Sequence, residues 1–517
     1  MGVDHPDRPS VRALVERRAA ESPQAVYAIA PDTGQQLTFA RLLSSARGLA
    51  GMLARRGVAP GDRVALLLPN GLQALRLFIG IMAAGHVATP LSLLAQPDQL
   101  AYVLEHSDCR LVFAGPEQAA MLRDSAARQV RQIAVVIVDP DADWIAGEAV
   151  HGGHGAWPGP AQESTDSALL MYTSGTTGRP KGVLLSHGNV CAGARFVSEA
   201  HALDAADRVL AVLPLYHINA QIVTALAPLH HGGSVVLPRR FSAASFWSLA
   251  AEHRCTWLNV VPTIIAYLLQ GADPRTAGLD LSLLRFCRCA SAPLAPEHHQ
   301  AFESRFAIGI VETMGLTETA APVFSNPLDP ARRKIGSPGQ AFGNQARVVE
   351  AVQGLPLCNG VAGEIQVRGP NVMIGYHKAP QDTALAFTAD GWLRTGDLGY
   401  RDTAGFYFIT GRLKEIIIKG GENIAPREID EVLLRHPGVL EAAAFGVPDS
   451  NYGQEIEAAV TPKSGSAINV PELLGFCLRE LGRFKMPRAI HVLSDLPKGP
   501  SGKVQRLKLL QTIRPGA

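Results

Sequence analysis

The sequence predicts an α/β protein with two domains. The first is a large N-terminal domain of parallel-sheet αβ layers with a small β portion, and the second is a smaller C-terminal α/β domain. Strand, helix and strand patterns alternate at residues 61–69, 74–84 and 86–90, which indicates a parallel sheet with crossover helices. From about residue 335, short strands separated by glycines replace this alternation, and after Arg412 a separate α/β pattern begins.

The N-terminal part is expected to open with helices over residues 10–60. Leucines and alanines between residues 42 and 53 recur at helical spacing, and Gly57 follows them. In a parallel sheet of this kind, ligands usually bind in the loops after the strands. The sequence predicts further strands at 168–171, 209–213, 234–237, 257–261, 283–288 and 309–311, and helices at 214–229 and 244–253.

The C-terminal third changes in character twice. Strands expected at 363–369, 392–394 and 406–409 suggest a small antiparallel sheet. The unit that follows has two helices, each with one apolar face, as expected where a helix covers a sheet. We therefore divide the chain into domains 1–412 and 413–517. The second domain is predicted to contain strands 415–419, 440–447 and 455–461 and helices 427–435 and 471–481.

The composition narrows the class of protein. The chain has 517 residues, of which 47% are hydrophobic and 18% charged, as in globular proteins. Its net charge of +2 gives no reason to expect nucleic acid or an anionic membrane as a partner. No apolar run reaches the ~18 residues that span a bilayer, and residues 1–6 lack the features of a signal peptide. We expect a cytoplasmic protein without a membrane span.

The seven cysteines are scattered. Their one close pair, Cys287 and Cys289, lacks a second pair that would complete a metal site. We expect reduced and mostly buried thiols, with neither a metal site nor a disulfide framework.

The stretch 172–183 combines hydroxyl side chains, glycines and one lysine directly after an expected buried strand. Glycine lets backbone N–H groups approach an anion closely, and hydroxyl and ammonium groups add donors, so the stretch can hold a polyphosphate. It is not a Walker A loop, because Lys181 precedes Gly182. A flexible surface loop is the alternative. The candidate phosphate-binding residues are Thr173, Ser174, Gly175, Thr176, Thr177, Gly178 and Lys181.

This stretch resembles, almost letter for letter, the phosphate-binding loop of the adenylate-forming superfamily. The superfamily includes acyl-CoA synthetases, luciferases and the adenylation domains of peptide synthetases. Further motifs resemble this superfamily in the same order along residues 35–510. The resemblance implies an N-terminal domain that binds ATP and an acid, and a mobile C-terminal domain that carries a catalytic lysine. It also implies ATP, Mg²⁺ and CoA as cofactor and co-substrates.

The motif at residues 312–319 resembles the superfamily segment that contacts the nucleotide and its metal. The resemblance places Glu312 and Thr317 at ATP, with Thr317 at the α-phosphate, and gives Glu318 the support of Mg²⁺. A carboxylate is also what a phosphate-bound Mg²⁺ needs. The alternative for Thr317 and Glu318 is a helix cap. Met314 departs from the pattern, because an aromatic residue is usual there.

Two further positions complete the expected nucleotide site. Ser291 lies in a segment, residues 290–293, that resembles the loop beside the adenine. Asp397 resembles the carboxylate that accepts both ribose hydroxyls, and Arg412 resembles a second ribose contact. A lone Asp at this position would otherwise be read as a turn former.

The remaining candidates concern the acid, the CoA and domain movement. By resemblance, His217 gates the acyl pocket, Lys414 is the hinge, and Gly420 and Gly421 approach CoA. Lys503 resembles the catalytic lysine near the chain end. From the residues alone, His217 would be a core histidine, Lys414 a loop cation and Lys503 part of a solvated basic tail.

Together these motifs imply an ATP-dependent acid–CoA ligase that works through an acyl-adenylate. Residues 412–423, 325–328 and 332–336 look nearest to ligases of oxalate, carnitine and other small polar acids, although Ala321 stands where oxalate ligases tend to carry histidine. The expected pocket lining is polar, which favours a small dicarboxylate or a sulfonated acid such as sulfoacetate. That lining comprises Tyr216, His217, Asn219, Gln221 and Arg288.

Three alternatives remain open. The acid could be a medium-chain fatty acid or an aromatic acid. The acyl group could be loaded onto a carrier protein instead of CoA, or the chain could be a non-catalytic scaffold. The oligomeric state is not fixed by the sequence, and a homodimer is the candidate assembly.

Overall fold

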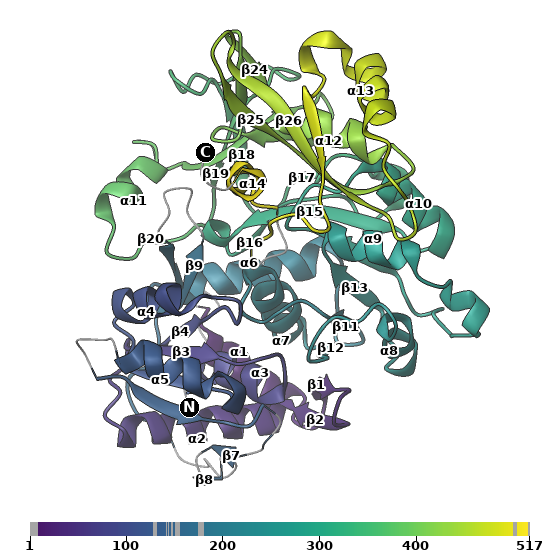
Figure 1. The fold of residues 1–517 in the computed structure, drawn as a ribbon. Coiled ribbons are helices and arrows are strands. Elements are labelled where there is room, and N and C mark those ends of the chain that lie inside the picture. The colour runs from purple at the N-terminus through teal and green to yellow at the C-terminus, as the bar shows by residue number, and fades with distance from the viewer. Residues whose placement is uncertain are drawn as a thin grey trace.

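The computed structural model describes residues 9–127, 132–140, 142, 144–145, 148–149, 156–173, 180–499 and 504–514. Figure 1 shows the N-terminal half of the chain at the bottom and the C-terminal residues, in yellow, stacked above it. In the described ranges, no helix is long and apolar enough to cross a membrane.

Two sheets with mostly parallel central strands form the body of the N-terminal domain. The first has nine strands in the order β17-β16-β15-β14-β13-β11-β12-β1-β2, and the second has seven in the order β20-β10-β9-β4-β3-β5-β6. The first contains β1 (Val26–Ala30), β2 (Gln35–Thr38), β11 (Arg208–Ala211), β12 (Ser234–Val236), β13 (Trp257–Val260), β14 (Phe286–Cys289), β15 (Ile310–Leu316), β16 (Ala321–Ser325) and β17 (Gln340–Ala341). The second contains β3 (Arg63–Leu67), β4 (Val87–Pro90), β5 (Leu111–Ala114), β6 (Ala134–Ile137), β9 (Ser167–Thr173), β10 (Lys181–Ser186) and β20 (Gly375–Tyr376).

Helix α3 (Leu72–Ala83) lies between these two sheets. It contacts β1 and β2 of the first sheet and β3 and β4 of the second. All twelve of its residues are buried, including the polar Gln73 and Arg76, as expected of a mostly apolar helix that is covered on both sides. The other helices of this domain are α1 (Val11–Glu21), α2 (Phe39–Arg55), α4 (Pro97–His106), α5 (Ala119–Ala127), α6 (His187–Ala200), α7 (Ala227–His231), α8 (Phe246–Glu252), α9 (Pro262–Gln270), α10 (Pro296–Phe306) and α11 (Pro380–Ala386).

Short elements complete this domain. A π-helix, η2 (Asn219–Leu226), leads into α7, and single 3₁₀ turns occur at η1 (Pro116–Gln118), η3 (Pro274–Ala277), η4 (Thr317–Thr319) and η5 (Pro330–Arg332). Strands β7 (Trp144–Ile145) and β8 (Glu148–Ala149) form a small hairpin. The predicted antiparallel portion is confirmed as a four-stranded sheet of β18 (Gln345–Val349), β19 (Gly363–Arg368), β21 (Leu393–Arg401) and β22 (Tyr407–Arg412).

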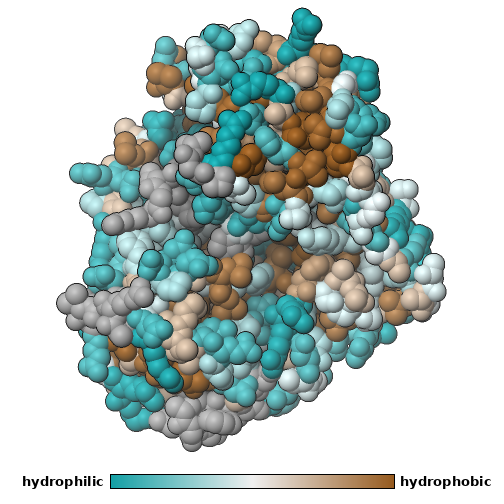
Figure 2. All heavy atoms as spheres, viewed as in Figure 1, coloured by the Kyte–Doolittle hydropathy of each residue, from teal (hydrophilic) through white to brown (hydrophobic). Residues whose placement is uncertain are grey.

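The C-terminal residues fold around their own core. Ile417, Leu433, Ala458 and Leu473 belong to a buried cluster whose members all come from this part of the chain. A separate core supports the proposed division, while the exact boundary after Arg412 stays a prediction. The elements are β23 (Ile417–Lys419), β24 (Glu422–Ile424), α12 (Pro426–Leu434), β25 (Val439–Asp449), β26 (Gly453–Pro462), α13 (Val470–Lys485), β27 (Ala489–Val492) and α14 (Arg506–Ile513). Figure 2 shows hydrophobic residues gathered on this domain, near α12 and α13.

Three details differ from the sequence-based expectation. Strands β1 and β2 interrupt the region 10–60, because a five-residue apolar run is too short to separate strand from helix by periodicity. Strand β15 extends beyond Val311, because β16 turns back and pairs with it. Glu312 therefore lies within a strand and not in a loop. Asp397 likewise lies within β21, where Gly396 has a φ of +70°.

Candidate active site

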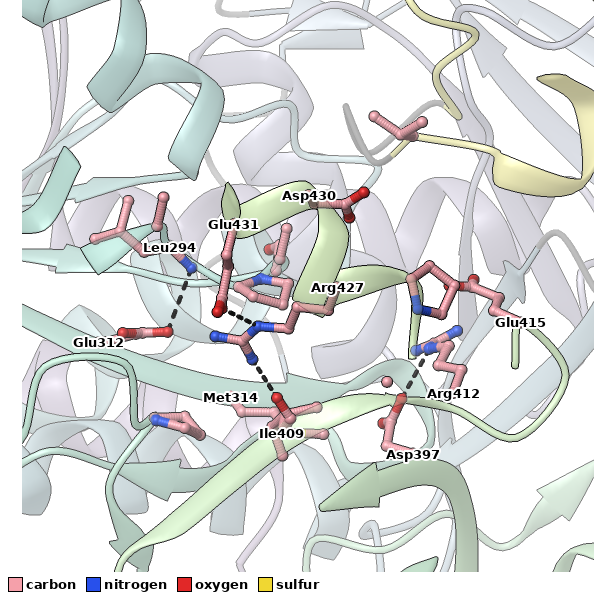
Figure 3. A pocket seen from close by; sticks show the side chains of 18 of the residues that line it. Leu294, Glu312, Met314, Asp397, Ile409, Arg412, Glu415, Arg427, Asp430 and Glu431 are labelled. Carbon is pink, nitrogen blue, oxygen red and sulfur yellow. Dashed lines mark hydrogen bonds and ion pairs between the residues drawn. The ribbon is translucent and has the colours of Figure 1, made fainter. Parts of the chain in front are cut away.

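A pocket lies where the two domains meet (Figure 3). Four residues predicted to bind ATP line it together, namely Ser291, Glu312, Asp397 and Arg412. The first and last of them, Ser291 and Arg412, are more than a hundred positions apart in the sequence, so only the fold brings the four together. The C-terminal domain contributes residues of α12 and the residues Val504 and Arg506. The pocket is thus lined by residues of both domains.

Asp397 offers this pocket a free carboxylate oxygen. Its Oδ1 accepts a hydrogen bond of 2.7 Å from Nε of Arg412, which is its register partner across β21 and β22. Its Oδ2 is buried and has no partner among the described residues. The negative charge of Asp397 raises the pKa of Arg412. A buried acceptor without a partner is costly, so this oxygen is well suited to a ligand hydroxyl.

Glu312 is the second such acceptor. It is 3% exposed, and its Oε1 accepts from the Leu294 backbone N–H at 3.4 Å, while Oε2 is buried without a partner in the described structure. Burial raises the pKa of this carboxyl group. In Figure 3, the side chain of Arg427, from α12, lies to the right of Glu312. Arg427 donates through Nε to Glu431 at 2.7 Å and through Nη1 to the Ile409 carbonyl. Arg427 thus links the domains beside Glu312.

Lys181 and Glu318 form a second cluster. The Lys181 ammonium lies 2.6 Å from Oδ1 of Asp382 and 5.1 Å from the centre of the Tyr376 ring. The Tyr376 hydroxyl donates to Oε1 of Glu318 at 3.0 Å. The charge of Glu318 contributes to the raised pKa of Arg412, so the two clusters are neighbours. Tyr376 therefore connects the predicted phosphate cation with the predicted metal carboxylate.

The helix-cap alternative for Thr317 and Glu318 is not supported. Together with Thr319 they form the single turn η4. The hydroxyl that accepts the Leu316 backbone N–H, at 3.0 Å, belongs to Thr319. The side chains of Thr317 and Glu318 are therefore not needed to cap this turn.

The hairpin of β9 and β10 holds both ends of the predicted phosphate loop. Thr173 and Lys181 are register partners in this hairpin. Ser174, Gly175, Thr176, Thr177, Gly178 and Lys503 lie outside the described residues. Their predicted roles stay predictions.

Other candidates lie away from the pocket lining. His217 precedes η2 and contacts the Tyr216 ring at 4.5 Å. Lys414 is exposed in a turn closed by the Glu415 N–H and the Arg412 carbonyl at 3.0 Å. Gly420 and Gly421 form the two-residue turn between β23 and β24, with φ of +57° and +86°. Such a hairpin turn favours glycine at both positions, so these glycines have a structural reason that is independent of CoA.

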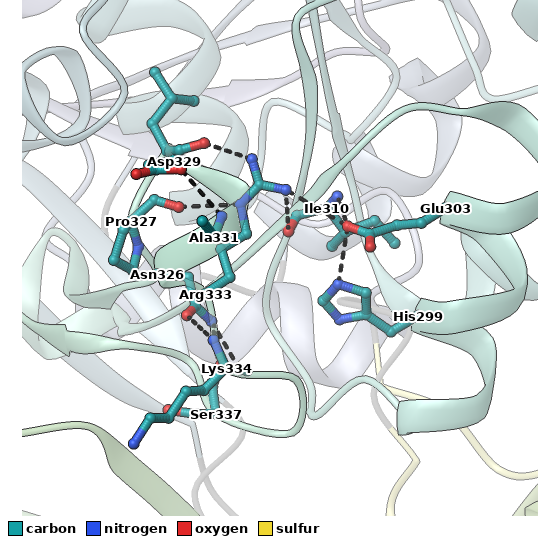
Figure 4. Close-up of polar contacts among 11 residues, drawn as sticks. His299, Glu303, Ile310, Asn326, Pro327, Asp329, Ala331, Arg333, Lys334 and Ser337 are labelled. Atoms are coloured by element: carbon teal, nitrogen blue, oxygen red, sulfur yellow. Dashed lines mark hydrogen bonds and ion pairs between the residues drawn. The ribbon is translucent and has the colours of Figure 1, made fainter. Parts of the chain in front are cut away.

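The segment 332–336, which resembles oxalate ligases, has a structural role (Figure 4). The Arg333 side chain donates to the carbonyls of Pro327 at 3.1 Å and Ile310 at 3.3 Å, and it lies 3.5 Å from Glu303 of α10. These contacts fix β15 against α10. No residue of 332–336 lines the pocket described above.

No local motif in the sequence pointed to Tyr376, Asp382 or Arg427. Tyr376 reaches the site because strand β20 pairs with strand β10. In this pairing Tyr376 lies opposite Val183, which is 193 positions earlier in the sequence. Long-range pairing of this kind is not visible in a short motif.

The comparisons with known proteins give the family of the chain. The model of the AMP-binding enzyme family matches residues 15–377, and that of the AMP-binding enzyme C-terminal domain matches residues 428–503. The chain is 56% identical to a sulfoacetate–CoA ligase of Cupriavidus necator, over 97% of both chains. It is 34% identical to an oxalate–CoA ligase of Arabidopsis thaliana, over 97% of this chain and 98% of that one. ATP-bound MatB from Rhodopseudomonas palustris has a TM-score of 0.87 at 30% identity, covering 97% and 99% of the two chains.

The chain therefore belongs to the AMP-binding enzyme family, and it is an ATP-dependent acid–CoA ligase of the adenylate-forming superfamily. The predicted superfamily, fold class and enzyme class are confirmed. The individual site residues, Mg²⁺, the CoA site and a homodimer stay predictions.

Proposed function

We propose that the protein converts sulfoacetate, ATP and CoA to sulfoacetyl-CoA, AMP and diphosphate. The observation that carries the choice of acid is the 56% identity, along 97% of both chains, to a ligase named for sulfoacetate. The nucleotide part is supported independently by Asp397 and Glu312, whose buried free oxygens line one pocket.

In the first step, a carboxylate oxygen of the acid attacks the α-phosphorus of ATP. A bond forms between these atoms, the bond from the α-phosphorus to the bridging oxygen breaks, and diphosphate leaves. Asp397 would accept the ribose hydroxyls and Glu312 the adenine amino group. Thr317, Lys181 and Lys503 would neutralise phosphate charge, so catalysis rests on positioning and electrostatics.

The donor set fits a Mg²⁺ ion that is bound mainly through phosphates. The described residues contain no group of three or more His, Cys, Asp or Glu side chains that could hold a metal alone. Glu318 supplies one oriented carboxylate, as expected for an ion that keeps water and phosphate ligands. The ion would supply charge neutralisation at the phosphates, and Tyr376 would orient Glu318 for it.

In the second step, the CoA sulfur forms a bond to the acyl carbon, and the bond from that carbon to the phosphate oxygen of AMP breaks. AMP leaves with the bonding electron pair, and the thiol proton is released to solvent. The C-terminal domain would rotate at Lys414 to bring Gly420 and Gly421 to the acyl-adenylate. The contact between Arg427 and the Ile409 carbonyl joins the two domains, so it would have to break during this rotation.

Replacing Glu312 by glutamine tests the adenine contact through pH. The ionised carboxylate accepts from the adenine amino group, so ATP affinity should weaken as the pH falls through the raised pKa of Glu312. The glutamine oxygen accepts at every pH, so Glu312→Gln should lose this pH dependence.

The same substitution should also affect stability. The pKa of Glu312 is higher in the folded state than in the unfolded state, so ionisation of Glu312 costs stability as pH rises. The variant should therefore melt at an equal or higher temperature at neutral pH.

The affinity for ATP is measured by calorimetric titration of both proteins from about pH 5 to pH 8, the range in which raised carboxyl pKa values fall. The same pH dependence in both proteins would show that another group causes it.

A panel of acids tests the proposed function. The protein is supplied with ATP, Mg²⁺, CoA and one of sulfoacetate, oxalate, malonate, acetate, octanoate or benzoate, and AMP formation is followed. Sulfoacetate should give the highest kcat/KM, and omission of CoA should stop turnover. Preference for octanoate or benzoate would contradict the proposal. Turnover with a carrier protein and not with CoA would favour the carrier-loading alternative.

A further inference from the structure

Arg288 is a buried cation without an anionic partner among the residues that the structure describes. It lies on β14 and is 1% exposed. Its Nη1 donates to Oδ1 of Asn219 at 3.0 Å and to Oδ1 of Asn259 at 2.9 Å, while its Nε is buried without any partner in the described chain. No described carboxylate lies within ion-pair distance of it. Both of its acceptors are neutral amides.

A buried charge of this kind is unusual, because charges removed from water are normally paired. Burial lowers the pKa of Arg288 to about 10, so the guanidinium remains charged at neutral pH. Arg506 shows the ordinary arrangement in this protein, because its guanidinium contacts both Asp430 and Glu415. Since no carboxylate of the described residues pairs with Arg288, a bound anion is a candidate partner for this charge.

The surroundings of Arg288 lead to the candidate active site. Asn259 and Arg288 are register partners on the parallel strands β13 and β14. Asn259 donates to Oδ1 of Asn219 at 3.2 Å, and Asn219 donates to Oγ of Ser291 at 3.1 Å. Ser291 lines the pocket with Glu312 and Asp397. The cluster thus lies behind the pocket wall, at the ends of parallel strands where ligands of such sheets bind.

We propose that Arg288, Asn219 and Asn259 form the subsite that holds the sulfonate of the acid. This inference rests on the proposed function and adds the residues that select the acid. A sulfonate carries a permanent negative charge and three acceptor oxygens, which suit a guanidinium and amide N–H donors. An acid with an uncharged tail would leave the guanidinium buried and unpaired. Selection therefore works both by attracting the anion and by penalising a neutral tail.

The test compares Arg288→Met with the wild type on three acids. Sulfoacetate and phosphonoacetate carry a tetrahedral anion, and 3,3-dimethylbutanoate has a similar shape without the charge. Loss of hydrogen bonds to a charged group should lower kcat/KM for sulfoacetate by about 10- to 100-fold. Phosphonoacetate should follow sulfoacetate. The value for 3,3-dimethylbutanoate should stay equal or rise, and Arg288→Lys should fall between wild type and Arg288→Met.

Melting temperature separates this role from a structural one. Arg288→Met removes a buried charge that has no described carboxylate partner, which favours folding, but it also removes the donor to Oδ1 of Asn219 and of Asn259. Because these two effects oppose each other, the melting temperature of the ligand-free protein should change little. Arg333→Met is the matched control, because Arg333 is a half-buried arginine that contacts Glu303 and three backbone carbonyls. That variant should melt at a lower temperature. Sulfoacetate should stabilise the wild type and Arg333→Met, but not Arg288→Met.

The outcomes distinguish the two proposals. If the wild type converts none of these acids, the proposed function fails and the subsite fails with it. If the wild type converts sulfoacetate and Arg288→Met keeps the same kcat/KM, only the subsite fails. A drop in melting temperature as large as that of Arg333→Met, with an equal loss on all three acids, would give Arg288 a structural role and overturn the subsite.

Discussion

Replacing Lys503 by alanine should abolish adenylation while leaving thioester formation from pre-made acyl-adenylate nearly unchanged. The proposed role of Lys503 is to neutralise charge where the carboxylate meets the α-phosphate. A transition-state contact of this sort contributes ~3–4 kcal/mol, or on the order of a few hundred-fold in rate. In the second step the reacting atoms are the CoA sulfur and the acyl carbon, and by our proposal the C-terminal domain has rotated before it. Lys503 then has no part in the reaction.

Each half-reaction is measured separately, as diphosphate exchange into ATP without CoA and as thioester formation from synthetic sulfoacetyl-AMP. Lys498→Ala is a control on the same segment, because the Lys498 ammonium contacts Glu441 and Asp495 and has no proposed role in catalysis. An equal loss in both half-reactions of Lys503→Ala would refute the rotation of the C-terminal domain between steps.

Replacing Asp397 by alanine should weaken ATP binding by about 10- to 150-fold, because charge-assisted hydrogen bonds contribute roughly 1.5–3 kcal/mol. The free Oδ2 is the acceptor that the ribose would use. The alanine variant also leaves Arg412 without its 2.7 Å partner, which adds to the loss. Calorimetric titration with ATP measures the affinity directly.

Asp397→Asn separates the two contributions. Its amide oxygen can still accept from Arg412, while its NH₂ group cannot accept a ribose hydroxyl. Binding of ATP should weaken in this variant, and binding of 2′,3′-dideoxy-ATP should be weak and equal in Asp397→Asn and wild type. Unchanged ATP affinity in Asp397→Asn would remove the ribose role from Asp397.

The sequence predicted those parts of the fold that depend on local pattern. The apolar runs around β3, β9 and β13 and the helix α3 follow from hydrophobic patterning, and the structure confirms them. The position of Glu312 within β15 could not be predicted, because it depends on β16 returning to pair with that strand.

In the candidate site too, some residues could be predicted from local motifs and others depend on long-range contacts. Asp397, Arg412 and Ser291 were found through motifs, and the fold places them around one pocket. The Tyr376 contact to Glu318 and the Asp382 contact to Lys181 join segments far apart in the chain. The charge of Arg288 was visible in the sequence, but its lack of a carboxylate partner is a property of the packed structure.

Sulfoacetate-dependent exchange of labelled diphosphate into ATP, measured without CoA, tests the central claim most directly. The account predicts that label enters ATP only when sulfoacetate and Mg²⁺ are present, and that later addition of CoA releases AMP and sulfoacetyl-CoA in equal amounts. Formation of ADP and phosphate, or the absence of exchange in an enzyme that still makes the thioester, would contradict a route through an acyl-adenylate.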